Sequence, residues 1–410
     1  MSFSRADRSR LAEWWFTVDR QLLVLILTLV GVGLLLSVAA SPAIAMKRGF
    51  PTYHFVIRQF VFAGIGVSVM LAVSFLSPGN IRRLALAMFI ASLAGLVAVL
   101  AIGTEINGAR RWLPILGQTI QPSEFMKPSF IVMTAWLFAQ TKHRPDMPAL
   151  TMAWATFALV TGLIVVEPDI GQTTLIVTVW GALYVLSGQP WLGVAGLGAL
   201  AAAGGRLAYE FRPYFRARVD RYFAGTTGDH SQVDRAMQAF MQGGFWGRGP
   251  GEGTIKIVLP DAHTDFIFAV VAEEYGIIAC LFLLALFGAI AAKAILRAAN
   301  DADHGNRLAT IGLALVFSIQ ALINMGVNAG LLPAKGMTLP FISAGGSSTI
   351  AVSITLGMLL ALTRKRTELA NLKKPRLVPI ASLKMGKSRA RRWWGRRAHT
   401  NETSQELRPK

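Results

Sequence analysis

Long apolar stretches separated by short polar segments dominate this chain. Residues 21–46, 59–81, 84–104 and 147–166 contain no Asp, Glu, Lys or Arg. A helix of about 20 apolar residues is long enough to cross the hydrocarbon core of a bilayer, roughly 30 Å thick. Each of these four stretches therefore predicts one membrane-spanning helix.

The remaining apolar segments bring the predicted number of spans to ten. Residues 170–205 are also uncharged but too long for one crossing, and Ser187-Gly188-Gln189-Pro190 divides them, because Gly and Pro interrupt helices. Four further spans are predicted at residues 124–141, 266–292, 308–332 and 347–363. The pattern predicts an all-α integral membrane protein with ten transmembrane helices.

Composition supports the same class of protein. Hydrophobic residues make up 53% of the 410 residues and charged residues only 15%, with a mean hydropathy of +0.48. These values exclude an ordinary soluble domain. The single cysteine, Cys280, lies in the eighth predicted span, so the chain cannot form an intrachain disulfide.

The distribution of basic residues predicts the orientation of the spans. An even number of spans puts both termini on one side, and residues 364–410 carry 15 Lys or Arg against three Glu. Basic segments stay in the cytoplasm. We therefore predict a cytoplasmic segment at 1–20, a membrane domain at 21–363, a basic cytoplasmic tail at 364–410, and an extracytoplasmic loop at 206–264 between helices 7 and 8.

The net charge of +19 belongs largely to that tail, which contributes +12. The stretch Arg391–Arg397 mixes Trp with Arg next to a membrane span, which favours anionic membrane lipids as its partner, not nucleic acid. A solvated tail without a partner is the alternative.

Two groups of charged residues lie around the start of the fourth predicted span. Arg110 and Arg111 are adjacent in an external loop, and paired guanidiniums suit bidentate recognition of a phosphate. Ser123 is suited to cap the span, with Glu124 in the first turn. Lys127 follows Glu124 by three residues, so the two share a helix face and are expected to pair. A helix start with one ion pair and no further role is the alternative.

Carboxylates mark two more span boundaries. Residues 167–169 separate two spans, and Asp169 is suited to cap the second, which makes a plain turn the simplest interpretation. Asp265 lies where a long polar loop meets the eighth span. An ionisable side chain is costly to desolvate at that depth, so Asp265 is a functional candidate.

Glu273 lies inside the eighth span and must face the protein interior. We expect it to support the bundle by pairing with Lys127 or Lys335. Lys335 belongs to the segment 332–348, rich in Pro, Gly and Ser, which is predicted to be irregular. Irregular backbone near a membrane is tolerated only where protein or water covers it. We therefore expect this segment to line an outward-facing cavity, with Lys335, Ser343 and Ser347 as candidate substrate-binding residues.

The loop at 206–264 is basic although it is predicted to be outside. It contains Arg212 and Arg216, which add to the candidates for binding a phosphorylated substrate. Its glycine-dense stretch, residues 243–253, predicts either a flexible turn or close approach of backbone to a ligand.

Together these motifs closely resemble the SEDS family of bacterial shape, elongation, division and sporulation proteins, from about residue 11 to 366. The matching motifs occur in family order: Asn107–Trp112, Gln121–Glu124, Pro168–Gly171, Ala262–Ala269, Glu273-Glu274, Pro340–Ser343 and Gly345–Ser348. Residues 333–340 and 247–253 resemble the division branch, FtsW, more than the elongation branch, RodA. Ala344 departs from the family pattern, which usually has Tyr there.

The resemblance implies a peptidoglycan glycosyltransferase that polymerises lipid II at the division septum, on the outer face of the bacterial cytoplasmic membrane. It implies a class B penicillin-binding protein and other divisome proteins as partners, and it assigns Asp265 to the family's catalytic aspartate. A carboxylate there is suited to act as general base. Arg110, Arg111, Arg212, Arg216 and Lys127 would stabilise the polyprenyl pyrophosphate leaving group.

Two other functions remain open at this point. Intramembrane acids, a cavity and broken helices are also found in transporters, so a lipid II flippase is one alternative, and a non-catalytic divisome scaffold is another. No His or Cys cluster has metal-ligand spacing. A divalent cation, Mg²⁺ or Mn²⁺, bridging the pyrophosphate is compatible with the sequence.

Overall fold

The computed structural model divides the chain into two units, Met1–Arg364 and Lys365–Lys410. It describes residues 9–47, 49–106, 109–115, 117–211, 216–217, 219–220, 232–333 and 336–365. Its longer helices are α2 (Arg20–Lys47), α3 (His54–Ser74), α4 (Pro78–Ile102), α5 (Pro122–His143), α6 (Ala149–Val166), α7 (Ile170–Leu186), α8 (Trp191–Phe211), α12 (Ile267–Ala299), α13 (His304–Asn328) and α14 (Gly346–Leu362). Shorter helices are α1 (Arg10–Thr17), α10 (Gln232–Gly243) and α11 (Ile255–Val258).

Each of the ten predicted apolar segments coincides with one of the longer helices. Among the described residues, seven helices are long and apolar enough to cross a membrane: α2, α3, α4, α6, α8, α12 and α13. Two more, α7 and α14, are apolar but have 17 residues each. The predicted second span at 59–81 is displaced to His54–Ser74, because Ser77 accepts a hydrogen bond from Asn80 N and begins α4 there.

The prediction of an all-α fold is wrong for residues 104–120. Strands β1 (Thr104–Ile106), β2 (Ala109–Ile115) and β3 (Gln118–Ile120) form an antiparallel sheet in the order β1-β2-β3. Gly117, at φ 76°, allows the tight turn between β2 and β3. The sheet pairs its own backbone groups over the end of α4, which a bare loop at this position would leave to water.

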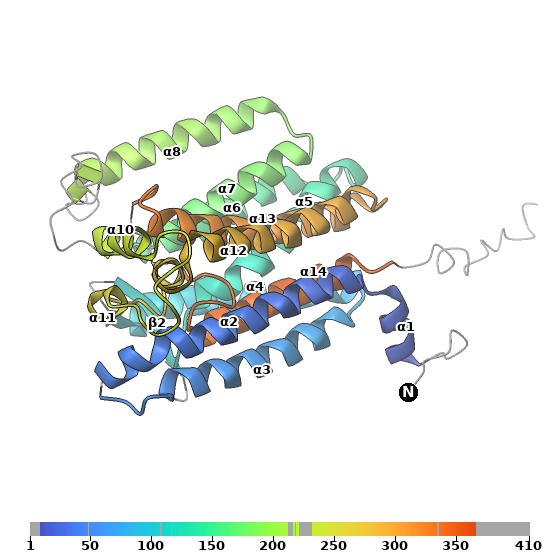
Figure 1. The fold of residues 1–410 in the computed structure, drawn as a ribbon. Helices are drawn as coiled ribbons and strands as arrows, with labels where there is room; N and C mark the ends of the chain where they lie inside the picture. The colour runs from blue at the N-terminus through green and yellow to red at the C-terminus, as the bar shows by residue number, and fades with distance from the viewer. Residues whose placement is uncertain are drawn as a thin grey trace, which may run out of the picture. The chain divides into compact units, whose positions relative to one another are not determined.

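The described ends of the first unit lie at the same end of the helix bundle. Arg364, just after α14, donates to Thr17 Oγ1 at 2.9 Å and to Phe75 O at 3.3 Å. The sheet, α10 and α11 lie at the opposite end (Figure 1). An even number of passes produces this arrangement. Helix α8 contacts α7 and has no buried residue, and Figure 1 shows it set apart from the other helices.

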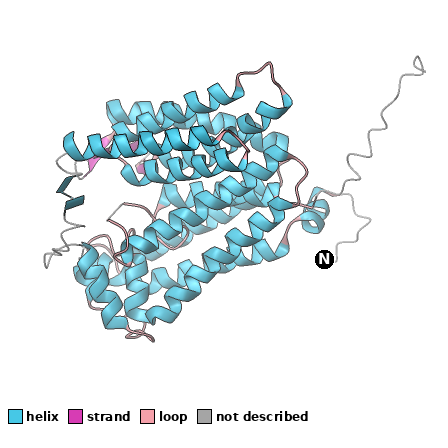
Figure 2. Ribbon diagram, turned by 90° about the horizontal axis from the view of Figure 1, so that it is seen from above, coloured by secondary structure: helices cyan, strands magenta, loops and turns pink. Residues whose placement is uncertain are grey.

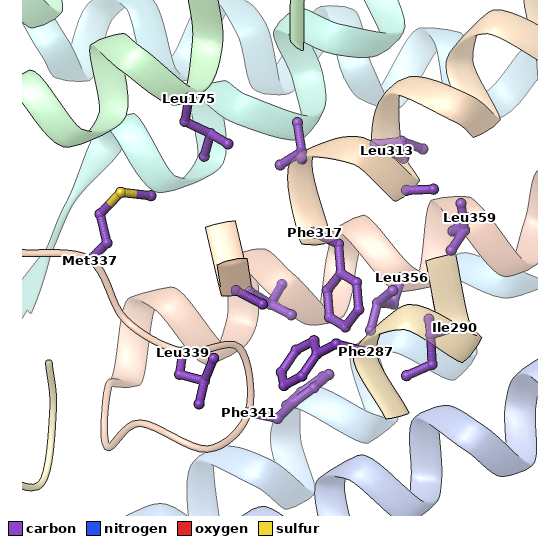
Figure 3. Close-up of a cluster of buried hydrophobic side chains, with 14 of the residues drawn as sticks. Leu175, Phe287, Ile290, Leu313, Phe317, Met337, Leu339, Phe341, Leu356 and Leu359 are labelled. Atoms are coloured by element: carbon purple, nitrogen blue, oxygen red, sulfur yellow. The ribbon is translucent and has the colours of Figure 1, made fainter. Parts of the chain in front are cut away.

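The helices run side by side, as the view from above shows (Figure 2). The core among α12, α13 and α14 also takes in the irregular segment before α14. Phe341 of that segment lies beside Phe287, and Met337 points toward Leu175 of α7 (Figure 3); these four residues and Leu339 are buried. Residues 337–343 of the predicted irregular segment are therefore largely covered by protein, and their apolar side chains are part of the core.

Helix α12 is broken at Gly276, which has φ 76° and ψ 179°. The predicted continuous span at 266–292 is thus two helices joined at a kink. A left-handed φ at this position requires glycine. A side chain at Gly276 would also collide with Phe245 O, 2.2 Å from the position of a Cβ.

The glycine-dense stretch 243–253, called here the glycine hook, pairs with this break. Arg248 N donates to Glu273 O at 2.9 Å, and Ile277 N donates to Gly244 O at 2.9 Å. A Cβ at Gly247 would lie 2.2 Å from Glu274 O. The stretch whose composition predicted a flexible turn or a close approach to a ligand is thus held against α12 at Gly244, Gly247 and Arg248, while Pro250 and Gly251 line a cavity. The glycines of the hook allow it to supply the hydrogen bonds that the broken helix lacks.

Candidate active site around Asp265

Asp265 lies in the turn just before α12, and two buried amides hold its backbone. Its carbonyl oxygen accepts hydrogen bonds from Asn324 Nδ2 at 2.8 Å and from Asn328 Nδ2 at 2.9 Å, both on α13. Asn328 also accepts from Ala269 N at 3.1 Å, which ties the first turn of α12 to the same helix. The peptide carrying Asp265 is thus fixed from a neighbouring helix.

The Asp265 carboxylate, in contrast, makes no hydrogen bond to any described residue. It is partly buried and faces Gly336, where a Cβ would lie 3.3 Å from Asp265 Oδ2. A fixed backbone with an unengaged carboxylate is the arrangement expected of a group that acts on a ligand and not on the fold.

The segment before α14 forms one wall of the site. Ser343 Oγ donates to Thr264 O at 2.5 Å and accepts from Leu339 N at 2.7 Å, while Ala344 N donates to His263 O at 2.9 Å. Ser343 was a candidate for substrate binding, and its hydroxyl is engaged in joining these two loops. Ser347, in the first turn of α14, is only partly buried.

Charged groups around Asp265 influence its ionisation. The pKa of Asp265 is raised to about 7, mainly by burial and also by the negative charges of Asp261 and Asp169, while the positive charge of Arg111 opposes the rise. A carboxyl with a pKa near neutrality is suited to take up and release a proton at physiological pH.

Arg111 reaches from β2 to the turn between α6 and α7. It donates from Nε to Glu167 O at 3.2 Å and from Nη2 to Pro168 O at 2.5 Å, and its Nε lies 3.9 Å from Asp169 Oδ2. Asp169 caps α7 as predicted, accepting from Gln172 N at 3.1 Å. Burial raises the pKa of Asp169, and the positive charge of Arg111 opposes this.

Glu167 is the least expected member of this group. It is 1% exposed, and neither carboxylate oxygen has a hydrogen-bond partner. Its pKa is raised to about 8, mainly by burial and also by the negative charge of Asp169, while the positive charge of Arg111 opposes the rise. Glu167 therefore keeps its proton at neutral pH, beside the arginine that holds the turn.

Arg110 and Arg111 are expected from adjacency to grip one phosphate, but their place in β2 does not bring their side chains together. Successive side chains of a strand point to opposite faces, and both residues lie in β2. Arg110 instead lies 3.5 Å from Glu105 Oε2 in an exposed ion pair. Arg111 alone faces the group around Asp265.

Inside the bundle, Glu124 and Lys127 pair as predicted. Lys127 Nζ lies 2.8 Å from Glu124 Oε2 and donates to Gln320 Oε1 at 2.7 Å, while Gln172 Nε2 donates to Glu124 Oε1 at 2.6 Å. Ser123 does not cap α5, because Pro122 occupies the first helical position and Gln121 becomes the cap.

This buried network continues in both directions. Gln121 Nε2 donates to Asp169 Oδ2 at 3.2 Å, which connects it to the group around Arg111. On the other side, Gln320 Nε2 donates to Thr338 O at 3.0 Å, next to the wall of the Asp265 site. The network thus joins α5, α7 and α13 beneath the site and satisfies most of the charged atoms that it buries.

Of the two partners expected for Glu273, Lys127 is paired elsewhere and Lys335 lies outside the described residues. The Glu273 carboxylate accepts three backbone hydrogen bonds, from Thr254 N at 2.6 Å, Ile255 N at 2.8 Å and Lys256 N at 3.2 Å. It does not pair with Lys127, which is committed to Glu124. The three N–H groups begin α11, where a carboxylate is favoured. Lys256 Nζ pairs with Glu274.

Other predicted candidates have local partners or fall outside the described residues. Arg216 is exposed, 3.6 Å from Asp220 Oδ2 and over the ring of Tyr209. Arg212 and Lys335 fall outside the described residues. Within the described ranges, no group of three or more His, Cys, Asp or Glu side chains is arranged to hold a metal ion.

Sequence reasoning missed the neutral amides of the site: Gln172, Gln320, Asn324 and Asn328. Each is buried within a helix. An amide in an apolar helix is costly to bury without partners, so its presence there was an available signal.

The chain matches the family model described as "Cell cycle protein", FTSW_RODA_SPOVE, over residues 20–368. It is 43% identical over 366 residues to a "Probable peptidoglycan glycosyltransferase FtsW" of Caulobacter vibrioides, covering 89% of this chain and 94% of that one. A protein of the same description from Hydrogenovibrio crunogenus is 34% identical over 357 residues, covering 84% and 90%.

Solved structures match a similar share of the chain. One belongs to a peptidoglycan synthase complex described as coordinating polymerization and crosslinking, with a TM-score of 0.72, 29% identity, and coverage of 85% of this chain and 98% of that one. The rod shape determining protein RodA of Thermus thermophilus gives a TM-score of 0.63 at 28% identity, covering 86% and 99%.

Proposed function

We propose that Asp265 is the general base of glycosyl transfer by this chain. The premise is that the chain belongs to the FtsW, RodA and SpoVE family of cell cycle proteins. The chain is a multi-pass membrane protein and a peptidoglycan glycosyltransferase. The observation that carries the proposal is the contrast at Asp265 between a backbone held by Asn324 and Asn328 and a carboxylate that has no hydrogen bond to the described residues.

The reaction joins two lipid II molecules. The carboxylate of Asp265 takes the proton from an acceptor sugar hydroxyl as that oxygen bonds to the anomeric carbon of the donor. The bond from that carbon to the polyprenyl pyrophosphate breaks at the same time, so the anomeric configuration inverts. Partial burial favours this role, because a base with a pKa of about 7 is unprotonated in a useful fraction at neutral pH and still binds a proton well.

Arg111 is the proposed cation for the pyrophosphate. It is the arginine whose charge acts on Asp265, and its guanidinium is fixed by the carbonyls of Glu167 and Pro168. Arg110, Arg212, Arg216 and Lys335 remain proposed contacts for the rest of the substrate, with Ser347 on the α14 side. Lys127 is better placed as a support, together with Glu124, Asp169 and Glu273, because its ammonium is buried between two partners.

A divalent cation would enter with the pyrophosphate. Mg²⁺ needs only one or two carboxylates when phosphates supply other ligands, and a carboxylate neighbouring Asp265 would supply one, which leaves Asp265 to take the proton. Such an ion would neutralise charge on the leaving group.

The proposed orientation places all ten longer helices across the bacterial cytoplasmic membrane, with Asp265 outside and both termini inside. The excess of basic residues after α14 supports this, with anionic lipids as partners of the tail. We propose a class B penicillin-binding protein as the crosslinking partner, together with other divisome proteins at the septum. The similarity to a synthase complex that polymerises and crosslinks supports that partnership.

Asp265→Asn tests the central proposal. The amide keeps the size of the side chain but cannot accept a proton, so glycan polymer formed from lipid II is expected to fall at least about 100-fold, with normal insertion and thermal stability. The assay should contain the crosslinking partner, in case the chain depends on it.

Asp261→Asn is the matched control. It removes a carboxylate four residues away at φ 53°, a conformation that Asn accepts. It should keep polymerising, with a pH profile displaced to lower pH, because one negative charge beside Asp265 is gone. Polymerisation by Asp265→Asn at the rate of the unmodified chain would exclude Asp265 as the base.

A further inference from the structure

A cavity lies at the opposite end of the bundle from Asp265. It has a volume of about 460 Å³ and is enclosed by the start of α4, the end of α5, the start of α13 and the end of α14. From His304, at this cavity, to Asn324, which holds Asp265, is 20 residues of α13, or roughly 30 Å. This terminal cavity therefore has no part in the proposed glycosyl transfer. Its size is within the range of about 300–1,000 Å³ found for small-molecule sites.

The terminal cavity is amphipathic. Apolar side chains form its inner wall: Val132, Trp136, Ala139, Ala309 and Leu362. Exposed Arg82 and His143 lie at its rim with the partly buried Gln140. A ligand that fills it would need an apolar body and a polar group at the rim.

His304 indicates which kind of polar group a ligand in the terminal cavity would supply. Its Nδ1 lies 2.8 Å from Arg307 Nη2. A guanidinium only donates, so Nδ1 accepts, and the proton of the neutral ring is then on Nε2. That Nε2 is buried and has no hydrogen-bond partner. A buried donor without an acceptor is costly, and a ligand oxygen at this point would satisfy it.

The charges around this donor favour an anion. Lys142, His143 and Arg307 lie close enough to His304 to act on it electrostatically, and Arg82 lines the same cavity. The N-termini of α4 and α13, which carry partial positive charge, also end here. One acid, Asp303, lines the described part of the cavity, and its Oδ1 already accepts from Asn306 N at 3.0 Å as the cap of α13.

We propose that the terminal cavity binds the phosphate group of a ligand with an apolar body, the chemistry of an anionic phospholipid. Arg82 and His304 Nε2 contact the phosphate oxygens, and the wall at Ala139 and Ala309 contacts the apolar part. The site is distinct from the sugar-transferring site and lies at the end of the bundle that carries the described ends of the first unit.

Lipid retention by the full-length chain tests this. The chain in neutral detergent is mixed with phosphatidylglycerol or phosphatidylcholine, and bound lipid is counted by native mass spectrometry. One phosphatidylglycerol is expected to bind at least about tenfold more tightly than phosphatidylcholine. Arg82→Gln should remove most of that preference, and His304→Phe should weaken the binding of both lipids. Arg83→Gln is the control, because it removes the same charge from the next residue, which does not line the cavity.

Two further measurements separate the phosphate from the apolar body. Inorganic phosphate alone should bind only at millimolar concentration and should lose that binding in Arg82→Gln. Ala139→Leu fills the inner wall and should weaken phosphatidylglycerol while leaving inorganic phosphate unchanged. Equal binding of the two lipids, or an equal loss in Arg83→Gln, would overturn the site. Arg82 is exposed, so its variant gives an answer even if His304→Phe fails to fold.

Discussion

At the scale of single residues, the site separates positioning from chemistry. Asn324 and Asn328 use their amide donors on the carbonyl of Asp265 and leave its carboxylate unengaged. A carboxylate that hydrogen-bonded those amides directly would be a weaker base, because bonds to the charged form lower its pKa. The two amides therefore fix the base in space without reducing its affinity for a proton.

The two adjacent arginines should differ sharply. Arg111→Gln is expected to lower polymerisation at least about tenfold, because it removes both the proposed cation for the pyrophosphate and the clamp on the turn at Glu167. Arg110→Gln should cost less than about threefold, since its exposed pair with Glu105 contributes little. Initial rates of lipid II consumption for the two single variants test this, and equal losses would restore the idea of a joint phosphate grip.

Glu167 predicts a pH dependence of stability. Its pKa is about 8 in the folded chain against 4.5 for an ordinary Glu, so between these values the folded state holds a proton that the unfolded state has released. Stability therefore falls as pH rises from about 4.5 to 8. In Glu167→Gln this contribution is absent, so its Tm relative to the parent chain should rise steadily from pH 5 to 8. Parallel Tm curves for the two proteins would contradict the raised pKa.

Only part of the site is readable from the sequence at this scale. Asp265, Asp169 and the Glu124–Lys127 pair are predictable, because charged residues at the edges of apolar segments are conspicuous. The roles of Asn324 and Asn328 are not predictable, since an amide in an otherwise apolar helix indicates a buried partner but not which loop contains it. The opposite directions of Arg110 and Arg111 follow from a strand that was not predicted.

At the scale of elements, the length of the apolar segments predicted the helices, but the sequence did not predict where a helix is broken. Each predicted apolar segment coincides with a helix, because about 20 apolar residues can satisfy their backbone in a membrane only as a helix. The break in α12 was invisible, because one glycine in an apolar helix is common. It becomes a break only because the glycine hook, over 20 residues earlier, supplies partners for it.

Adding one methyl group to the glycine hook tests its packing against α12. Gly247→Ala places a Cβ at φ 80°, 2.2 Å from Glu274 O, so the hook must move away from the break. Left-handed strain alone costs about 1–3 kcal/mol, which in a chain of this size lowers Tm by roughly 1–4 °C. Gly288→Ala is the control within α12, because a Cβ there meets nothing within 4 Å. It should leave Tm unchanged or slightly raised, and equal Tm values for both variants would contradict the docking of the hook.

At the scale of the whole molecule, the two ends of the bundle differ in construction. At one end, backbone-paired loops and the small sheet surround Asp265. At the other, Trp14 donates to Ser74 Oγ at 2.9 Å and Arg364 to Thr17 Oγ1 at 2.9 Å, which joins α1 to the helices beside it. The polar network through α5, α7 and α13 is the part of the interior that connects the helices beneath the polymerising site.

That network decides whether Lys127 contacts substrate or supports the fold. Lys127→Met leaves Glu124 buried and without its counter-charge, which should destabilise the chain by about 3–5 kcal/mol and reduce polymerisation with it. Adding Glu124→Gln removes the unpaired charge, so the double variant should regain most of the stability. If Lys127 is a support, polymerisation by the double variant should return to within about threefold of the unmodified chain, measured at equal amounts of folded protein. A double variant that is stable but inactive would instead put the Lys127 ammonium on the pyrophosphate, because the fold would then no longer need it while the reaction still did.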